Sequence, residues 1–173
     1  MARFNAKVAM RWSDMDAYGH VNNVQFLTYV EEARVDMFKL VPWGTDQLEA
    51  GIVVAQSEIK YMHPLLHRHA PVPIDVWVTH IGAASFRLQY EVHENGAEDF
   101  DPAGSDDSRD AKAETKPGLV YATASSVMVP YDFAAERPRR LTADEKAWLG
   151  TYLEPAASDA KRVERGDRDP ATA

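Results

Sequence analysis

Residues 11–23 read RWSDMDAYGHVNN and separate two segments of different periodicity. In residues 6–12 apolar side chains alternate with polar ones, a pattern that predicts a half-buried β-strand. In residues 26–41 apolar side chains recur every three or four positions with charged residues between them, which predicts a helix with one apolar face. Asn22 or Asn23 can cap the start of this helix, because an asparagine side chain accepts hydrogen bonds from the free amides there.

The predicted helix has a wide apolar stripe and ends at Pro42 and Gly44. It would span roughly 18 residues and about 27 Å, and a sheet could wrap around its apolar stripe. Four further strand-like segments follow without a helix between them, at residues 55–61, 74–78, 86–92 and 119–129. Parallel neighbours would need long crossovers, so these strands should pair antiparallel. The predicted fold is α+β, with an antiparallel five-stranded sheet around one long central helix and the order β-α-β-β-β-β.

The chain is short enough for a single domain, which is expected over residues 1–153. Residues 82–84 should form a tight hairpin turn, and residues 141–149 begin with a Thr-Ala-Asp-Glu capping pattern that predicts a short helix. Residues 94–117 contain eight acidic and three basic residues, which indicates a disordered acidic insertion. Residues 154–173 are polar and charged, and are expected to form a flexible tail.

The composition excludes several classes of site. The chain has no cysteine, which rules out disulfides, thiolate metal sites and cysteine nucleophiles. Its formal net charge of -8 argues against a nucleic-acid partner. Because no 18 apolar residues run together and the first residues lack the apolar segment of a signal peptide, we expect a cytoplasmic protein with no membrane partner. The sequence also lacks a serine-hydrolase elbow and a glycine-rich phosphate loop.

The segment 11–23 is also the richest in groups that carry chemistry. It leads into a helix whose first backbone amides are unpaired and can hold an anion or a developing oxyanion. Asp14, Asp16 and His20 supply carboxylates and an imidazole beside these amides, and Gly19 lets a ligand approach the backbone closely. The alternative is purely structural, since Asp, Gly and Asn before a helix are also common as caps and turns.

A resemblance to a known family favours the chemical interpretation. The run of residues 12–23, followed by Tyr-Val-Glu-Glu-Ala-Arg at 29–34, closely resembles the signature of the 4-hydroxybenzoyl-CoA thioesterase family of hotdog-fold proteins. Its His-Val-Asn-Asn portion also resembles plant acyl-ACP thioesterases. The likeness continues through Tyr-Met-His-Pro at 61–64 and Ile-Gly-Ala-Ala-Ser-Phe at 81–86, and covers residues 5–133 outside the insertion. It implies a hotdog fold and an acyl-CoA thioesterase.

The resemblance also implies roles for individual residues. The family's catalytic carboxylate falls on Asp16, which would act as nucleophile or as general base in hydrolysis of the thioester to free acid and CoA. His20 matches a functional histidine of the acyl-ACP branch. Tyr18, Gly19 and Asn23 are the expected oxyanion and positioning residues. The plant branch has an asparagine where this chain has Tyr18, so a relay through that asparagine does not transfer. No cofactor is expected, since coenzyme A is part of the substrate.

Candidates for binding the substrate lie elsewhere in the chain. Ser85 matches a family position beside the pantetheine channel. Arg68 and Arg139 could meet CoA phosphates, although solvated surface charges are the more common reason for such arginines. Three histidines share one loop and could suggest a metal site: His63, His67 and His69. They lack acidic partners at metal-ligand spacing, so no metal is predicted.

Two other functions stay open from the sequence. The first is a hotdog hydratase or dehydratase acting on an acyl thioester, although the Asp-x-Asn-Pro-x-His pattern of that branch is absent around Asp16 and His20. The second is a non-catalytic module that binds acyl-CoA. In every case the exposed sheet edges and the family resemblance imply a homodimer or homotetramer with sites at the subunit interface.

Overall fold

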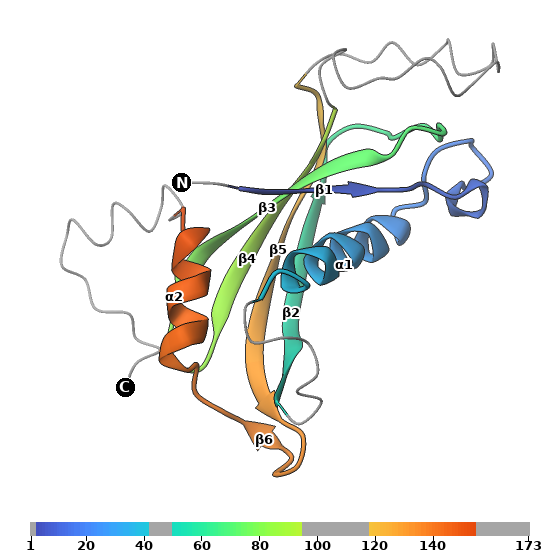
Figure 1. Cartoon of the computed structure of the whole chain (residues 1–173). Helices are drawn as coiled ribbons and strands as arrows, with labels where there is room; N and C mark the ends of the chain where they lie inside the picture. Colours follow the sequence, from blue (N-terminus) through green and yellow to red (C-terminus); the bar gives the residue numbers. More distant parts are fainter. Residues whose placement is uncertain (1–2, 42–49, 95–117, 155–173) are drawn as a thin grey trace.

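The computed structural model describes residues 3–41, 50–94 and 118–154 (Figure 1). Within these ranges six strands form one sheet, accompanied by two α-helices and one turn of 3-10 helix. In chain order the elements are β1 (Phe4–Val8), η1 (Trp12–Asp14), α1 (Gln25–Phe38), β2 (Ala50–Tyr61), β3 (Val72–Ile81), β4 (Phe86–His93), β5 (Val120–Asp132), β6 (Arg137–Pro138) and α2 (Ala143–Thr151).

The sheet is antiparallel throughout, in the order β1-β3-β4-β5-β2, with β6 paired to the end of β5. β1 and β2 are consecutive strands in the chain but form opposite edges of the sheet. The connection between them contains α1, which lies across one face of the sheet (Figure 1). α2 packs beside the end of α1, where the rings of Phe38 and Trp148 are 6.0 Å apart.

The core lies between α1 and the face of the sheet that it covers. The apolar residues that α1 buries recur at helical spacing: Phe26, Tyr29, Val30, Ala33 and Met37. In β4 alternate residues are buried from Phe86 to Val92, as a strand with one covered face requires. The predicted antiparallel sheet and the α+β class are therefore confirmed, with β6 as a sixth strand beyond the five that the sequence predicts.

The boundaries of α1 differ from the prediction. The helix has 14 residues and a length of about 21 Å, shorter than predicted, and it ends at Phe38. Leu40 lies in the turn that follows and is 54% exposed. Neither asparagine is the N-cap, a position that Val24 occupies. Asn22 accepts the Val24 amide at 3.0 Å, which forms an Asx turn just before the helix and is not an N-cap bond.

Other predicted elements compare as follows. The four later strands and the short C-terminal helix are confirmed, the latter with its capping box between Thr142 and Glu145. The two-residue strand β6 was not predicted. Pro42 and Gly44 lie outside the described residues, as does nearly all of the predicted acidic insertion and flexible tail. No helix in the described ranges is long and apolar enough to cross a membrane.

Candidate active site

The segment between β1 and α1 folds into a small hairpin. Met15 and Val21 form an antiparallel bridge, and the amide of Asp16 donates to the carbonyl of His20 at 2.8 Å. Gly19 lies at the tip with φ of 77° and donates its amide to the carbonyl of Asp16 at 3.1 Å. Since residues with a Cβ rarely adopt this positive φ, glycine is what allows the tight turn.

The hairpin fixes the carboxylate of Asp16. Its Oδ1 accepts the amide of Tyr18 at 2.8 Å and the amide of His20 at 3.3 Å. Among the described residues no donor reaches the other oxygen, Oδ2, and the side chain is only half-buried. One oxygen therefore orients the group and the other is free for a substrate or a water molecule.

The base of the hairpin is held by Asp14, a carboxylate that is only 3% exposed. Its Oδ2 accepts the amide of Arg11 at 2.8 Å and the hydroxyl of Tyr29 at 2.7 Å. Its backbone carbonyl accepts the amide of Asn22 at 2.8 Å. Burial and the bond to Asp14 both raise the pKa of Tyr29, so its hydroxyl keeps its proton and donates.

The backbone amides of the loop are nearly all engaged within the chain. Those with an acceptor are Tyr18, Gly19, His20, Val21 and Asn22. The amide of Asn23 has no acceptor in the part of the chain that the structure describes. Asn23 is exposed and stands two residues before α1, where the positive end of the helix dipole favours a negative charge. Of the predicted oxyanion donors, Asn23 is the one whose amide is free.

The other predicted loop residues lie in the same hairpin. His20 is half-buried and forms an antiparallel bridge with Leu66, which anchors the loop to the segment before β3. Its imidazole has no hydrogen-bond partner among the described residues. Tyr18 is 85% exposed, so its side chain is available to a ligand or to another subunit while its amide holds Asp16.

Two tyrosines that contact this site were not predicted as site residues. Tyr29 falls on the buried face of α1, and its hydroxyl reaches Asp14. Tyr61 ends β2 and donates its hydroxyl to the carbonyl of Asn23 at 2.8 Å. For Tyr29 the sequence carries a signal, because a tyrosine on the buried face of a helix needs a partner for its hydroxyl. Tyr61 is 43% exposed, so this signal does not apply to it.

Among the three predicted substrate-binding residues, both arginines are paired with carboxylates of the same chain. Arg68 donates to Glu94 at 2.5 Å, and Glu94 also accepts the hydroxyl of Tyr121 at 2.6 Å. Arg139 forms two hydrogen bonds with Glu145 of α2, at 2.7 and 2.9 Å. The structure thus gives both guanidinium groups a role inside the chain.

Ser85, the third predicted binding residue, lies in the turn between β3 and β4, where its carbonyl accepts the amide of Gly82 at 2.8 Å. The turn is one residue longer than the predicted 82–84. This turn follows the last residue of β3, a strand of ten residues that is about 30 Å long. The first residue of β3 comes soon after Leu66, which bridges to His20 of the hairpin. Within one chain, Ser85 is therefore far from the hairpin.

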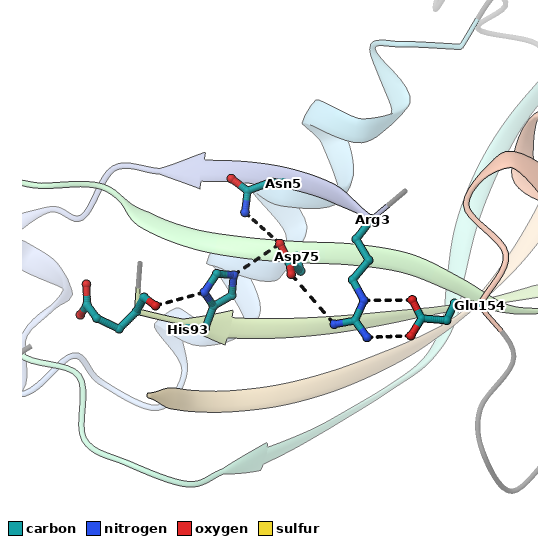
Figure 2. A network of polar contacts seen from close by, with 6 residues as sticks. Arg3, Asn5, Asp75, His93 and Glu154 are labelled. Carbon is teal, nitrogen blue, oxygen red and sulfur yellow. Dashed lines mark hydrogen bonds and ion pairs between the residues drawn. The ribbon is translucent and has the colours of Figure 1, made fainter. Parts of the chain in front are cut away.

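A second polar cluster lies on β1, β3 and β4 and includes a histidine beside an aspartate (Figure 2). His93 Nε2 is 3.4 Å from Asp75 Oδ1, which also accepts the side-chain amide of Asn5 at 2.8 Å. Arg3 pairs with Glu154 through two hydrogen bonds of 2.8 and 3.1 Å. Within the described residues no hydroxyl joins these contacts. The pair of Arg3 and Glu154 links the segment before β1 to the segment after α2.

The described residues form no group of three or more histidine and acidic side chains that could hold a metal ion. Of the loop histidines, His67 and His69 contact each other edge to face, with ring centroids 5.7 Å apart.

Comparison with known proteins agrees with this architecture. A family model described as the thioesterase-like superfamily matches residues 10–149. The solved structure of a predicted thioesterase from Bacillus stearothermophilus has a TM-score of 0.71 and 22% identity, and the match covers 90% of this chain and 100% of that chain. A thioesterase from Thermus thermophilus, solved in complex with coenzyme A and Zn, has a TM-score of 0.60 and 26% identity over 84% of this chain and 94% of that chain.

Among curated proteins, the uncharacterized protein YsmA of Bacillus subtilis (strain 168) is 31% identical over 87 residues. These residues are 50% of this chain and 58% of YsmA, so the match spans little more than half the length of that relative.

Proposed function

The chain belongs to the thioesterase-like superfamily, and on that premise we propose that it hydrolyses an acyl-CoA thioester to the free acid and CoA, with Asp16 as nucleophile or general base. The observation that carries the proposal is the pairing of two features in one loop. The Asp16 carboxylate is oriented by two amides, and its other oxygen has no partner among the described residues. Within the same residues the Asn23 amide, two positions before α1, has no acceptor. A thioester carbonyl needs these two elements, an attacking group and an oxyanion donor.

Two routes fit this geometry. In the first, the free oxygen of Asp16 attacks the carbonyl carbon, the C–S bond breaks, CoA leaves as the thiolate, and water hydrolyses the resulting mixed anhydride. In the second, Asp16 takes a proton from a water molecule that attacks the same carbon, and the C–S bond then breaks with CoA leaving as the thiolate. In both, the Asn23 amide and the dipole of α1 stabilise the negative charge on the carbonyl oxygen. A thiolate leaves without a strong acid, so His20 is not needed to protonate the leaving group. Its proposed role is to orient the substrate.

Coenzyme A is the proposed carrier of the acyl group. Support comes from the similar thioesterase of Thermus thermophilus, whose structure contains coenzyme A. Arg68 and Arg139 are weak candidates for its phosphates, because each already pairs with a buried carboxylate. Exposed groups of the loop, such as the side chain of Tyr18, are better placed to meet the carrier.

A homodimer, alone or doubled into a tetramer, is the proposed assembly. β2 is a twelve-residue edge strand that pairs with β5 on one side and with no described residue on the other. Residues 54–58 of this strand are exposed, and Val54 is 43% exposed. A long edge with apolar side chains is a natural template for pairing with another strand, and a second β2 would cover it symmetrically.

The test is thiol release from acetyl-, hexanoyl-, decanoyl- and benzoyl-CoA by the wild type, Asp16→Asn and a control, Asp36→Asn. Asp36 is an aspartate of α1 that pairs with Lys39 at 2.7 Å, outside the loop. We expect Asp16→Asn to lose two or more orders of magnitude in rate and Asp36→Asn to lose little, as for removal of one positioned catalytic group.

The other outcomes separate the alternatives. Unchanged hydrolysis by folded Asp16→Asn would remove Asp16 from the chemistry. Binding of acyl-CoA without thiol release by any variant would favour the non-catalytic module, and conversion of an enoyl-CoA with the thioester intact would favour a hydratase.

A further inference from the structure

We propose that Asp14 and Tyr29 are positioning residues, a buried pair that fixes the loop to α1 and thereby sets where Asp16 lies relative to the Asn23 amide. The inference rests on the proposed function, because it assigns a task to residues that would not themselves touch the substrate.

Asp14 connects three parts of the site. Its carboxylate accepts the hydroxyl of Tyr29 from α1 at 2.7 Å and the amide of Arg11 from the chain entering the loop at 2.8 Å. Its carbonyl accepts the amide of Asn22 from the chain leaving the loop at 2.8 Å. Both members of the pair are buried, with Asp14 3% exposed and Tyr29 0% exposed. Breaking these bonds would leave buried polar groups unpaired, so the bonds hold the loop against the helix.

The position of Asp14 in the chain explains why this anchor matters. Asp16 follows two residues later, and Asn23 directly follows Asn22, which Asp14 holds. A shift of Asp14 would move both the proposed nucleophile and the proposed oxyanion donor. Because a displacement of about 1 Å can cost on the order of a hundredfold in rate, a remote bond of this kind can control the chemical step.

Within the pair, Tyr29 is the group that donates the hydrogen bond. The Arg11 guanidinium lies 3.8 Å from Asp14 and donates to Glu32 at 2.7 Å, so the buried carboxylate has a cation nearby. Burial, followed by the bond to Asp14, raises the pKa of Tyr29. The tyrosine is thus a permanent donor at neutral pH and cannot act as a proton shuttle.

A purely structural role is the competing explanation, and the chain contains a matched control for it. Tyr121 donates to Glu94 at 2.6 Å, and this pair is also buried, at 5% and 7% exposure. Neither residue belongs to the loop or to α1. Tyr29→Phe and Tyr121→Phe therefore remove the same kind of bond, and they differ in whether the loop depends on it.

The experiment compares Tyr29→Phe, Tyr121→Phe, Asp14→Asn and Asp14→Ala in the full chain, with kcat and KM for the acyl-CoA that the wild type hydrolyses fastest. We expect both Tyr→Phe variants to lower Tm by similar amounts. Only Tyr29→Phe should lower kcat, by about ten- to a hundredfold, with KM changed by less than about twofold. Asp14→Asn keeps an acceptor oxygen and should recover part of the kcat that Asp14→Ala loses.

Hydrogen exchange of the Tyr18 and His20 amides gives a readout that does not need turnover. These amides bond to Asp16, and they should exchange faster in Tyr29→Phe but not in Tyr121→Phe. Equal kcat losses, or equal exchange, in the two Tyr→Phe variants would overturn the pair's positioning role. If the wild type releases no thiol from any acyl-CoA, the proposed function fails, and the exchange comparison still decides the role of the pair.

Discussion

The hydroxyl of Tyr61 donates to the carbonyl oxygen of Asn23 at 2.8 Å, which joins the last residue of the edge strand β2 to the residue with the unpaired amide. The ring of Tyr61 also packs edge to face against Phe26 of α1, with centroids 5.5 Å apart. The start of α1 is therefore held from two sides, by Tyr61 from the sheet and by Asp14 from the loop.

Tyr61→Phe should lower kcat while changing stability little. The variant keeps the ring contact with Phe26 and loses only the bond to Asn23, so the peptide groups around Asn23 gain freedom. Tyr61 is 43% exposed, so we expect a loss of no more than about 1 kcal/mol in unfolding free energy. Steady-state kinetics and urea unfolding measure the two effects. The control is Tyr131→Phe, because the hydroxyl of Tyr131 has no partner among the described residues. An equal loss of kcat in this control would contradict a role for the bond between Tyr61 and Asn23.

Gly19→Ala should cost both stability and activity. Gly19 has φ of 77° with no atom within 4 Å of an added Cβ, so the cost comes from backbone strain alone, about 1–2 kcal/mol. Gly118 has the same φ and the same open surroundings outside the site, which makes Gly118→Ala a matched control. Urea unfolding should show similar losses in the two variants, and thiol release should fall only in Gly19→Ala. A similar activity loss in both would remove the special role of the hairpin tip.

The sequence predicts most of this fold because the fold rests on local periodicity. Alternation identifies β4, and helical spacing identifies α1. The same periodicity overextends α1, since Val41 fits the pattern but the helix has already ended at Phe38. Strand β6 was not predicted, because two residues are too few to show a period.

The candidate site was predicted as a set of residues but not as an arrangement. The clustering of Asp16, His20 and Asn23 before a helix is visible in the sequence. Which amide stays unpaired depends on bonds inside the hairpin, and no spacing rule gives that answer. Likewise Arg68 meets Glu94 only because the fold brings together residues that are 26 positions apart.

The pair of Glu145 and Arg139 should make stability depend on acid pH. Burial raises the pKa of the Glu145 carboxyl, but the bonds from Arg139 and the Thr142 amide outweigh burial, so the pKa lies below its ordinary value of 4.5. A group with a lowered pKa in the folded state stabilises the protein above its unfolded pKa, and this contribution is lost as the pH falls through the folded pKa.

Urea unfolding of the wild type and Glu145→Gln across this range measures the effect. The wild type should be more stable at neutral pH, and the difference should shrink below about pH 4.5. Glu136→Gln, a change at an exposed glutamate, should leave the profile unchanged. A constant difference between the wild type and Glu145→Gln at all pH values would show that charge is not the cause.

Val54→Lys should weaken the proposed assembly. Val54 lies on the unpaired edge of β2 and is 43% exposed, and a lysine on such an edge opposes pairing with a second strand. Light scattering should show a lower molecular mass for the variant than for the wild type, with an unchanged circular dichroism spectrum. If the wild type is monomeric, or if the folded variant keeps its mass, the β2 edge is not the interface.

The placement of β1 and β2 at opposite edges also has a consequence for refolding. Ala6 pairs with Ile74, a residue 68 positions later, so β1 can join the sheet only after a long loop closes, whereas β3 and β4 form a local hairpin. The loop that carries Asp16 directly follows β1. After dilution from denaturant, we therefore expect strand signal to return before thiol release, because β1, on which the loop depends, joins the sheet later than the local hairpin of β3 and β4 forms.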